Sequence, residues 1–129
     1  MRLLLDTHAL VWALGFSSQL PKHLLSELKD PRNDLWCSSV NLIEIATKRS
    51  AGRRGAPQIS AAEALQLSQD VGFRLLLVTA EHAIAVETLA ISHPDPFDRL
   101  LLAQAQVEGL QLVTHDERLA RYDTRTFLF

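Results

Sequence analysis

Short apolar runs that alternate with helix-forming segments constrain the fold of this chain more than any other feature. The runs are Leu3–Leu5, Leu35–Ser38, Leu75–Val78 and Leu110–Thr114, with a fifth candidate at Thr126–Phe129. Runs of this length and polarity are typical of strands that are buried on both faces. The sequence therefore predicts a sheet whose two faces are both covered.

The segments between these runs have the signals of helices. Ser60 and Glu63 form a capping-box pattern, Thr79 can cap a later helix, and Gly109 ends another. Either Ser39 or Asn41 can cap the helix that follows the second run. The expected helices are Thr7–Leu14, Pro21–Lys29, a segment from Ser39 or Asn41 to Arg49, a segment from Ser60 to Gly72, Thr79–Ala90 and Phe97–Glu108. Strands that alternate with helices predict a mostly parallel sheet in an α/β fold, and residues 1–129 suit a single domain.

Composition excludes several classes of protein. The chain has 129 residues, is 47% hydrophobic and 22% charged, and has a single cysteine, Cys37, so that an internal disulfide is excluded. Every apolar run is shorter than the roughly 20 residues of a membrane helix, and the apolar stretch at the N-terminus is too short for a signal peptide. We therefore expect a cytoplasmic protein with no membrane partner.

A local cluster of positive charge stands out against a net charge of −2. Lys48, Arg49, Arg53 and Arg54 fall within seven residues, next to Gly52 and Gly55. The cluster is either a solvated loop or a patch that contacts the phosphates of a nucleic acid.

Four acidic residues are expected to meet at one edge of the sheet. Asp6 closes the first strand and Asp116 lies just past the fourth, so both belong to the carboxyl edge, where such sheets bind ligands. From Asp98 a helix of ten residues travels about 15 Å, and the next strand returns about 16 Å, which brings the chain back to the same edge. Glu44 lies early in the helix after the second strand, again near this edge.

Carboxylates gathered in this way favour a metal site. Each acid alone has an ordinary explanation, such as a helix dipole for Asp98, a turn for Asp116 or a solvated helix face for Glu44. A bare carboxylate at a buried strand end, as at Asp6, is costly without a partner. Carboxylate oxygens suit Mg²⁺ or Mn²⁺. Such an ion activates water and offsets phosphoryl charge, which suits phosphodiester hydrolysis.

Other polar residues lie next to this predicted site. Ser38 and Thr114 end two strands and either position a metal-bound water or cap backbone groups. His8 and His115 each neighbour an acid, and we expect packing or surface roles for them. The five histidines have no zinc-ligand spacing. Trp12 and Trp36 are expected in the core.

Four motifs resemble those of the VapC-like toxins of the PIN-domain family. They are Asp6-Thr7-His8-Ala9-Leu10-Val11-Trp12, Glu44-Ile45-Ala46-Thr47-Lys48, Asp95-Pro96-Phe97-Asp98-Arg99-Leu100-Leu101 with Ala103-Gln104-Ala105, and Val113-Thr114-His115-Asp116. Their order and spacing agree with the family from Leu3 to about Tyr122. Many relatives have serine at the position of Asn41 and tryptophan at that of Ile43.

This resemblance implies a fold, an activity and partners. The fold would be a three-layer α/β/α sandwich. The activity would be that of a Mg²⁺- or Mn²⁺-dependent endoribonuclease, the toxin of a type II toxin–antitoxin pair, held inactive by a cognate antitoxin and usually a homodimer. The family's catalytic and metal-binding acids map onto Asp6, Glu44, Asp98 and Asp116. Asp95 is the rival of Asp98, and we interpret it as a helix-start residue because prolines flank it.

Two other functions are considered. A phosphoacceptor receiver domain would need an aspartate near the middle of the chain and a late lysine, yet there is no Asp between Asp34 and Asp70 and no Lys after Lys48. A PIN fold kept only as an RNA-binding or interaction module is the second alternative. Metal-dependent cleavage of RNA by the pure protein distinguishes it from the nuclease.

Overall fold

A five-stranded parallel sheet forms the centre of the molecule. The computed structural model describes residues 1–15 and 17–129. The strands are β1 (Arg2–Leu5), β2 (Asp34–Ser38), β3 (Arg74–Leu76), β4 (Gln111–Thr114) and β5 (Phe127–Leu128). Their order is β3-β2-β1-β4-β5, and all neighbours pair in parallel. The predicted parallel sheet is confirmed, including its fifth strand.

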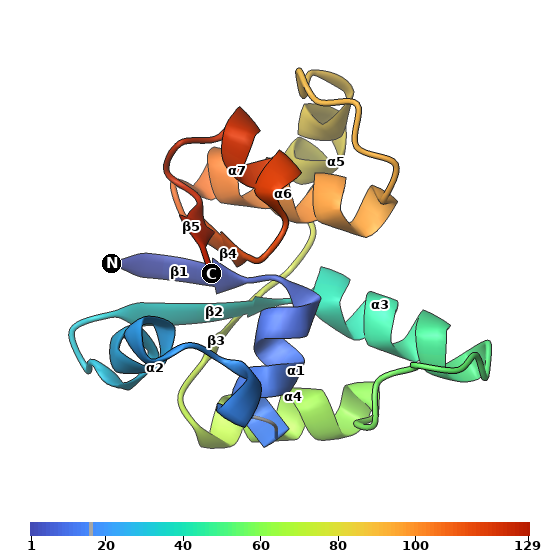
Figure 1. The fold of residues 1–129 in the computed structure, drawn as a ribbon. Coiled ribbons are helices and arrows are strands. Elements are labelled where there is room, and N and C mark those ends of the chain that lie inside the picture. The colour runs from blue at the N-terminus through green and yellow to red at the C-terminus, as the bar shows by residue number, and fades with distance from the viewer. Residues whose placement is uncertain (16) are drawn as a thin grey trace.

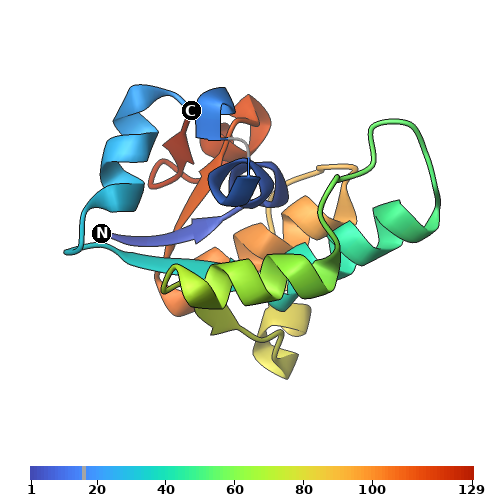
Figure 2. The same ribbon diagram turned by 90° about the horizontal axis from the view of Figure 1, so that it is seen from below.

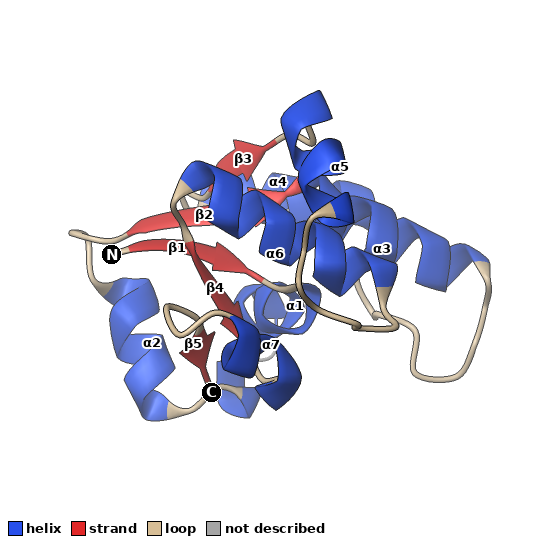
Figure 3. Ribbon diagram, turned by 90° about the horizontal axis from the view of Figure 1, so that it is seen from above, coloured by secondary structure: helices blue, strands red, loops and turns tan. Residues whose placement is uncertain are grey.

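Helices cover both faces of this sheet. They are α1 (Thr7–Gly15), α2 (Lys22–Lys29), α3 (Ser39–Ser50), α4 (Ala61–Asp70), α5 (Ala80–Glu87), α6 (Pro96–Glu108) and α7 (Glu117–Tyr122), with a short 3₁₀ turn at Ser17–Gln19. Figure 1 shows α5, α6 and α7 on one side of the sheet and α1, α2 and α4 on the other. From above, α6 lies across the strands (Figure 3). The α/β/α sandwich is therefore confirmed.

Alternation along β1 explains how the sheet is buried on both faces. Leu4 packs with Leu102 of α6 and Leu112 of β4. Leu3 and Leu5 point to the opposite face, where they share a cluster with residues of α1 and α2. Successive side chains of a strand point to opposite faces, so three consecutive leucines supply both cores. Trp12 and Trp36, expected in the core, are partly buried and pack against these clusters.

Several helix ends follow the predicted signals and one does not. Ser60 and Thr79 cap α4 and α5 as predicted. The cap of α3 is Ser38 rather than Ser39 or Asn41, because Asn41 occupies the third helical position and completes a capping box with Ser38. At the end of α6, Gly109 has a φ of 66°, a left-handed conformation that glycine adopts without strain.

Two short elements were not expected from the sequence: α7 and the 3₁₀ turn. Helix α7 has six residues, of which Leu119 is the buried one. An apolar period cannot be recognised over so few residues. β3 and α5 also end earlier than predicted, at Leu76 and Glu87.

The topology places β1 at the switch point of the sheet. The chain builds β1, β2 and β3 in one direction and then returns to add β4 on the other side of β1. The Asp6 amide donates to the Val113 carbonyl at 2.9 Å, which ties the ends of β1 and β4 together. In open parallel sheets, ligands bind outside the carboxyl edge at such a point.

Among the described residues, no helix is both long and apolar enough to cross a membrane.

Candidate functional site

Asp6 stands at the centre of the carboxyl edge. It is 4% exposed, and one carboxylate oxygen accepts the amide hydrogen of Ala9 at 2.8 Å in the first turn of α1. Burial raises the pKa of this carboxyl, while hydrogen bonds from Thr114 and Ala9 oppose the rise. The fold thus holds a carboxylate where it is poorly solvated.

Glu44 reaches the same edge from α3 and is only 3% exposed. The Thr7 hydroxyl donates to its Oε1 at 2.6 Å, and the Lys48 ammonium, one helical turn later, pairs with its Oε2. Asn41 supports this arrangement, because its amide donates to the Thr7 hydroxyl at 3.1 Å and to the Leu5 carbonyl at 3.2 Å. Asn41 therefore joins the end of β1 to the residues that orient Glu44.

Asp95 and Asp98 come from the start of α6. Asp95 is the N-cap, and its Oδ1 accepts the amide hydrogens of Phe97 at 2.9 Å and Asp98 at 3.3 Å. Asp95 therefore serves as the helix-start residue that the sequence suggests. Burial, together with the charges of Asp95, Asp6 and Glu44, raises the pKa of Asp98 to about 7.

Asp116 has the opposite environment. Its Oδ2 lies 2.7 Å from His93 Nε2, its Oδ1 accepts the Arg118 amide hydrogen at 2.8 Å, and the Arg118 guanidinium lies at 3.4 Å. Burial alone would raise the pKa of Asp116, but the hydrogen bonds from His93 and Arg118 outweigh it and lower the pKa to about 2. Asp116 also caps α7.

His93 bridges two of the acids. Its Nδ1 accepts the Asp95 amide hydrogen at 3.1 Å, so the neutral ring carries its proton on Nε2. That nitrogen lies 3.8 Å from Asp98 and 2.7 Å from Asp116. Polar atoms of His93, Asp98 and Asp116 lie within 4.8 Å of one another. With the proton on Nε2, His93 orients Asp116 instead of binding a metal itself, and the two carboxylates are close enough to share one ion.

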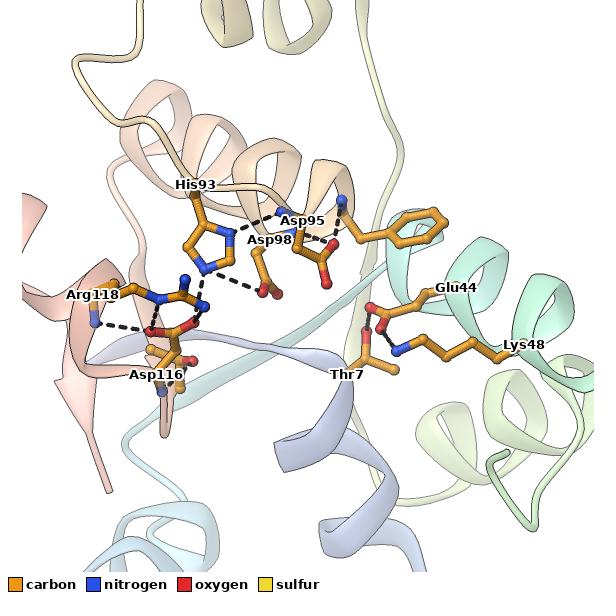
Figure 4. A network of polar contacts seen from close by, with 10 residues as sticks. Thr7, Glu44, Lys48, His93, Asp95, Asp98, Asp116 and Arg118 are labelled. Atoms are coloured by element: carbon orange, nitrogen blue, oxygen red, sulfur yellow. Dashed lines mark hydrogen bonds and ion pairs between the residues drawn. The ribbon is translucent and has the colours of Figure 1, made fainter. Parts of the chain in front are cut away.

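The four acids that the sequence singles out thus approach one edge in two groups. Figure 4 shows Thr7, Glu44 and Lys48 on one side and His93, Asp116 and Arg118 on the other, with Asp95 and Asp98 between them. The charges of Asp6 and Glu44 both act on Asp98, which links the groups electrostatically. Because Lys48 and Arg118 offer two positive charges against four carboxylates, negative charge remains at this centre that a divalent cation would balance.

The two hydroxyl residues of the predicted site lie fully buried at strand ends. Ser38 accepts the Val40 amide hydrogen and donates to Gln104 at 2.5 Å, contacts that favour the capping alternative. Thr114 accepts the Asp116 amide hydrogen at 3.1 Å and also bonds the Asp6 side chain. Thr114 therefore contacts both aspartates of the edge.

The predicted basic cluster divides between the site and a loop. Lys48 is 42% exposed and lies against Glu44. Arg49 donates to the Pro57 carbonyl at 2.8 Å and so braces the loop that follows α3. Arg53 and Arg54 are exposed in this loop. The connection from α3 to α4 stands away from the rest of the ribbon (Figure 2).

Comparison with known protein families identifies the family of this chain. The family model described as "PIN domain" matches residues 3–125. The chain belongs to the PIN domain family. A search of curated protein sequences finds no match.

Solved structures share the architecture of this PIN domain at low sequence identity. One is VapBC2 from Rickettsia felis bound to a DNA fragment from its promoter, with 19% identity, a TM-score of 0.67 and coverage of 100% of this chain and 98% of that one. Another is VapBC-1 from nontypeable Haemophilus influenzae, with 16% identity, a TM-score of 0.69 and coverage of 100% of this chain and 97% of that one. A third is a toxin–antitoxin complex from Klebsiella pneumoniae, with 17% identity, a TM-score of 0.60 and coverage of 95% of this chain and 93% of that one. At these identities the likeness shows the fold.

Sequence reasoning missed His93 and the supporting role of Asn41 in this PIN domain. His93 lies in a proline-rich stretch two residues before the Asp95 motif but 23 residues before Asp116, and only the fold brings it to Asp116. Its position before the Asp95-Pro96 helix start was the available signal. Asn41 was considered as a helix cap and as a departure from the serine of many relatives, not as a support for Glu44.

Proposed function

We propose that this PIN domain is a Mg²⁺- or Mn²⁺-dependent endoribonuclease and acts as the toxin of a toxin–antitoxin pair in the cytoplasm. The observation that carries the proposal is the approach of Asp6, Glu44, Asp98 and Asp116 to one sheet edge, where burial and like charge raise the pKa of Asp98 to about 7. Family membership supports a nuclease. Neighbours described as VapBC and toxin–antitoxin complexes support the biological role.

The donor set fits a hard divalent cation. Three carboxylates, those of Asp6, Asp98 and Asp116, supply oxygen ligands of the kind that Mg²⁺ and Mn²⁺ prefer, and Glu44 lies beside them. The raised pKa values of Asp6 and Asp98 indicate negative charge that the protein alone balances poorly. A bound cation supplies Lewis acidity, which makes water more acidic and offsets charge on phosphoryl oxygens.

The surrounding residues orient these ligands and offset their charge. His93 holds Asp116 through its Nε2 proton, and the Asp95 amide fixes the tautomer that allows this. Thr7 and Lys48 hold the two oxygens of Glu44. Arg118, whose side chain is 56% exposed, lies at the rim beside Asp116, where it can meet a phosphate.

RNA and a second protein are the proposed partners. Lys48, Arg49, Arg53 and Arg54 would contact the RNA backbone, and replacing Arg53 and Arg54 with alanine should flatten the salt dependence of RNA binding. An antitoxin would block the site. The homodimer expected from the resemblance remains a proposal, supported by exposed apolar side chains on and before α5, such as Leu77 and Ile84. Sedimentation at micromolar concentration tests it, and a monomer would reject it.

Incubation of the purified protein with single-stranded RNA tests the activity. We expect endonucleolytic products with Mg²⁺ or Mn²⁺ and none in excess chelator, with activity restored when the cation is added back. Cleavage that persists in chelator at the same rate, in preparations free of other nucleases, would contradict metal dependence. Binding of RNA without cleavage under every metal condition would favour the interaction-module alternative.

A further inference from the structure

Four rings gather on the surface next to the acids, and the chemistry described above does not use them. They belong to His8, Trp12, His115 and Phe129 and are called the aromatic platform below. The His8 and His115 ring centroids lie 4.9 Å apart, those of Trp12 and His115 lie 5.7 Å apart, and those of Trp12 and Phe129 lie 6.2 Å apart. His8 and His115 are exposed, while Trp12 and Phe129 are partly buried.

The platform borders the carboxyl edge of the sheet. His8 follows Asp6 by two residues in the first turn of α1, and His115 directly precedes Asp116 after β4. The C-terminal residue, Phe129, is held at this edge because its amide donates to the Thr114 carbonyl at 3.0 Å. A molecule held at the acids would therefore lie next to these rings.

Two rings of the platform, those of His8 and Trp12, line a hollow of about 270 Å³ together with Glu44. The rings of His115 and Phe129 line a neighbouring hollow that also includes Trp12. Helix α1 contributes His8 and Trp12 to the lining of the hollow beside Glu44, and α3 contributes Glu44 and Lys48. The loop segment 55–58 completes this lining. The volume lies near the lower end of the roughly 300–1,000 Å³ of small-ligand pockets, which suits a single ring system rather than a length of polymer.

The chemistry of this hollow fits a nucleobase joined to a phosphate. Aromatic rings, histidine included, offer faces on which unpaired bases stack. The amides of Gln19 and Gln58 line the same hollow and can bond the edge of a base. Lys48 places positive charge at the end nearest the acids, and Arg53 and Arg54 lie on the loop just before segment 55–58. This basic border favours a polyanion over an apolar peptide.

We propose that the aromatic platform, with the hollow between α1 and segment 55–58, binds an unpaired base of a single-stranded RNA beside the phosphodiester that the acids address. The proposal rests on the function proposed above and names the side chains that would hold a base next to the bond that is cleaved. Bases in a duplex stack on one another and are unavailable, so double-stranded RNA is disfavoured.

Trp12 itself reports on the platform. The chain has two tryptophans, and Trp36→Phe leaves Trp12 as the sole source of tryptophan fluorescence. In an Asp98→Asn, Trp36→Phe background, kept in chelator to prevent cleavage, a short single-stranded RNA should quench this fluorescence. The same RNA as a duplex, or a ribose-phosphate oligomer of equal length without bases, should bind about tenfold or more weakly and leave it unchanged.

Matched variants separate stacking from packing. His8→Ala, at an exposed position, should weaken single-strand binding about tenfold. His23→Ala removes an exposed histidine that stacks on Phe127 at 5.8 Å and does not line the hollow, so it should leave binding unchanged. Trp12→Phe keeps an aromatic face and should bind more tightly than Trp12→Leu. Thermal unfolding of each variant verifies that the fold is retained, and His8→Ala serves even where a Trp12 variant unfolds.

Three outcomes would overturn the proposal. If the parent cleaves RNA but the oligomer without bases binds as tightly as the RNA, the platform does not read bases, and the proposed function stands. If the parent neither binds nor cleaves RNA, both proposals fail. If Trp12 fluorescence responds to a partner protein but never to RNA, the platform is a protein-docking surface.

Discussion

Asp98 and Asp116 are carboxylates of the same sheet edge, yet their neighbours act on them in opposite directions. Burial and three like charges raise the pKa of Asp98 to about 7. For Asp116, the bonds from His93 and Arg118 overcome burial and lower the pKa to about 2. The sequence alone predicts a raised pKa for the whole cluster, because it shows the clustered acids but not which of them have cationic or hydrogen-bonding neighbours.

This contrast predicts opposite effects of two isosteric changes in the metal-free protein. The pKa of Asp98 in the folded protein exceeds the ordinary 3.8, so its ionised form destabilises the fold. This destabilisation is absent in acid, where the carboxyl is protonated, and reaches its full size above about pH 7. The folded pKa of Asp116 lies below 3.8, so its charge stabilises the fold above about pH 4 and loses this effect as the pH falls towards 2. At pH 8, Asp98→Asn should raise the melting temperature and Asp116→Asn should lower it.

Thermal melts in chelator between pH 4 and pH 8 measure both effects. The gain from Asp98→Asn should shrink towards pH 4, where the parent carboxyl is protonated in the fold. Shifts of the same sign for both variants at pH 8 would show that the two environments have been assigned wrongly.

His93 is predicted to be a positioning residue for Asp116. Groups that orient metal ligands typically contribute about 10–100-fold to metal affinity or activity, and we expect a loss of this size for His93→Ala. His93→Gln places an amide donor near the position of Nε2 and should recover part of the affinity. Manganese titrations of the parent and of the two variants measure these affinities. If His93→Ala binds manganese as tightly as the parent, His93 serves only to pack the loop before α6.

At the scale of the elements, a buried chain of polar groups joins β2, α3, α5 and α6. Ser38 donates to Gln104 at 2.5 Å, the Gln104 amide lies 3.3 Å from His82 Nδ1, and His82 Nε2 lies 2.8 Å from Glu108. Ser38, Gln104 and His82 are fully buried. Because Ser38 caps α3, which carries Glu44, this series of hydrogen-bonded polar groups helps to place α3 against α6.

Loss of the central amide should therefore destabilise the fold. Gln104→Leu keeps much of the volume but leaves the Ser38 hydroxyl without its acceptor, which we expect to lower the free energy of unfolding by about 1–3 kcal/mol. Gln66→Leu, on the exposed face of α4, is the control and should have little effect. Urea unfolding compares the two, and equal stabilities would remove the polar chain from the account of how α3 is held.

The elements that sequence predicted best are those whose signals are local. Three leucines before Asp6 define β1, and Ser60 with Glu63 defines the start of α4, because each pattern lies within a few residues. Helix α7 was not predicted because its six residues are too few to show the apolar periodicity of a helix. Of the two predicted caps of α3, Ser39 is one residue and Asn41 three residues past the actual cap, Ser38. Ser38 and Ser39 offer the same hydroxyl, and only the backbone selects between them.

At the scale of the whole molecule, the site is a product of topology. Asp6 and Asp116 are distant in sequence, yet each lies just past the end of one of the paired strands β1 and β4. The length of α6 against β4 allowed the sequence to place Asp98 near them. No such length argument was available for His93, whose loop has no regular rise per residue. The aromatic platform was also hidden, because Phe129 joins Trp12 only once β5 completes the sheet.

The central claim is that these carboxylates hold the cation that cleaves RNA. The most direct measurement is the single-turnover cleavage rate of one single-stranded RNA at saturating Mg²⁺, for the parent, for Asp98→Asn and for Asp70→Asn, an exposed aspartate at the end of α4. We predict that Asp98→Asn slows cleavage more than about a hundredfold, beyond the usual effect of groups outside the ligand set, while Asp70→Asn matches the parent. A folded Asp98→Asn variant that cleaves at the parental rate would contradict the account.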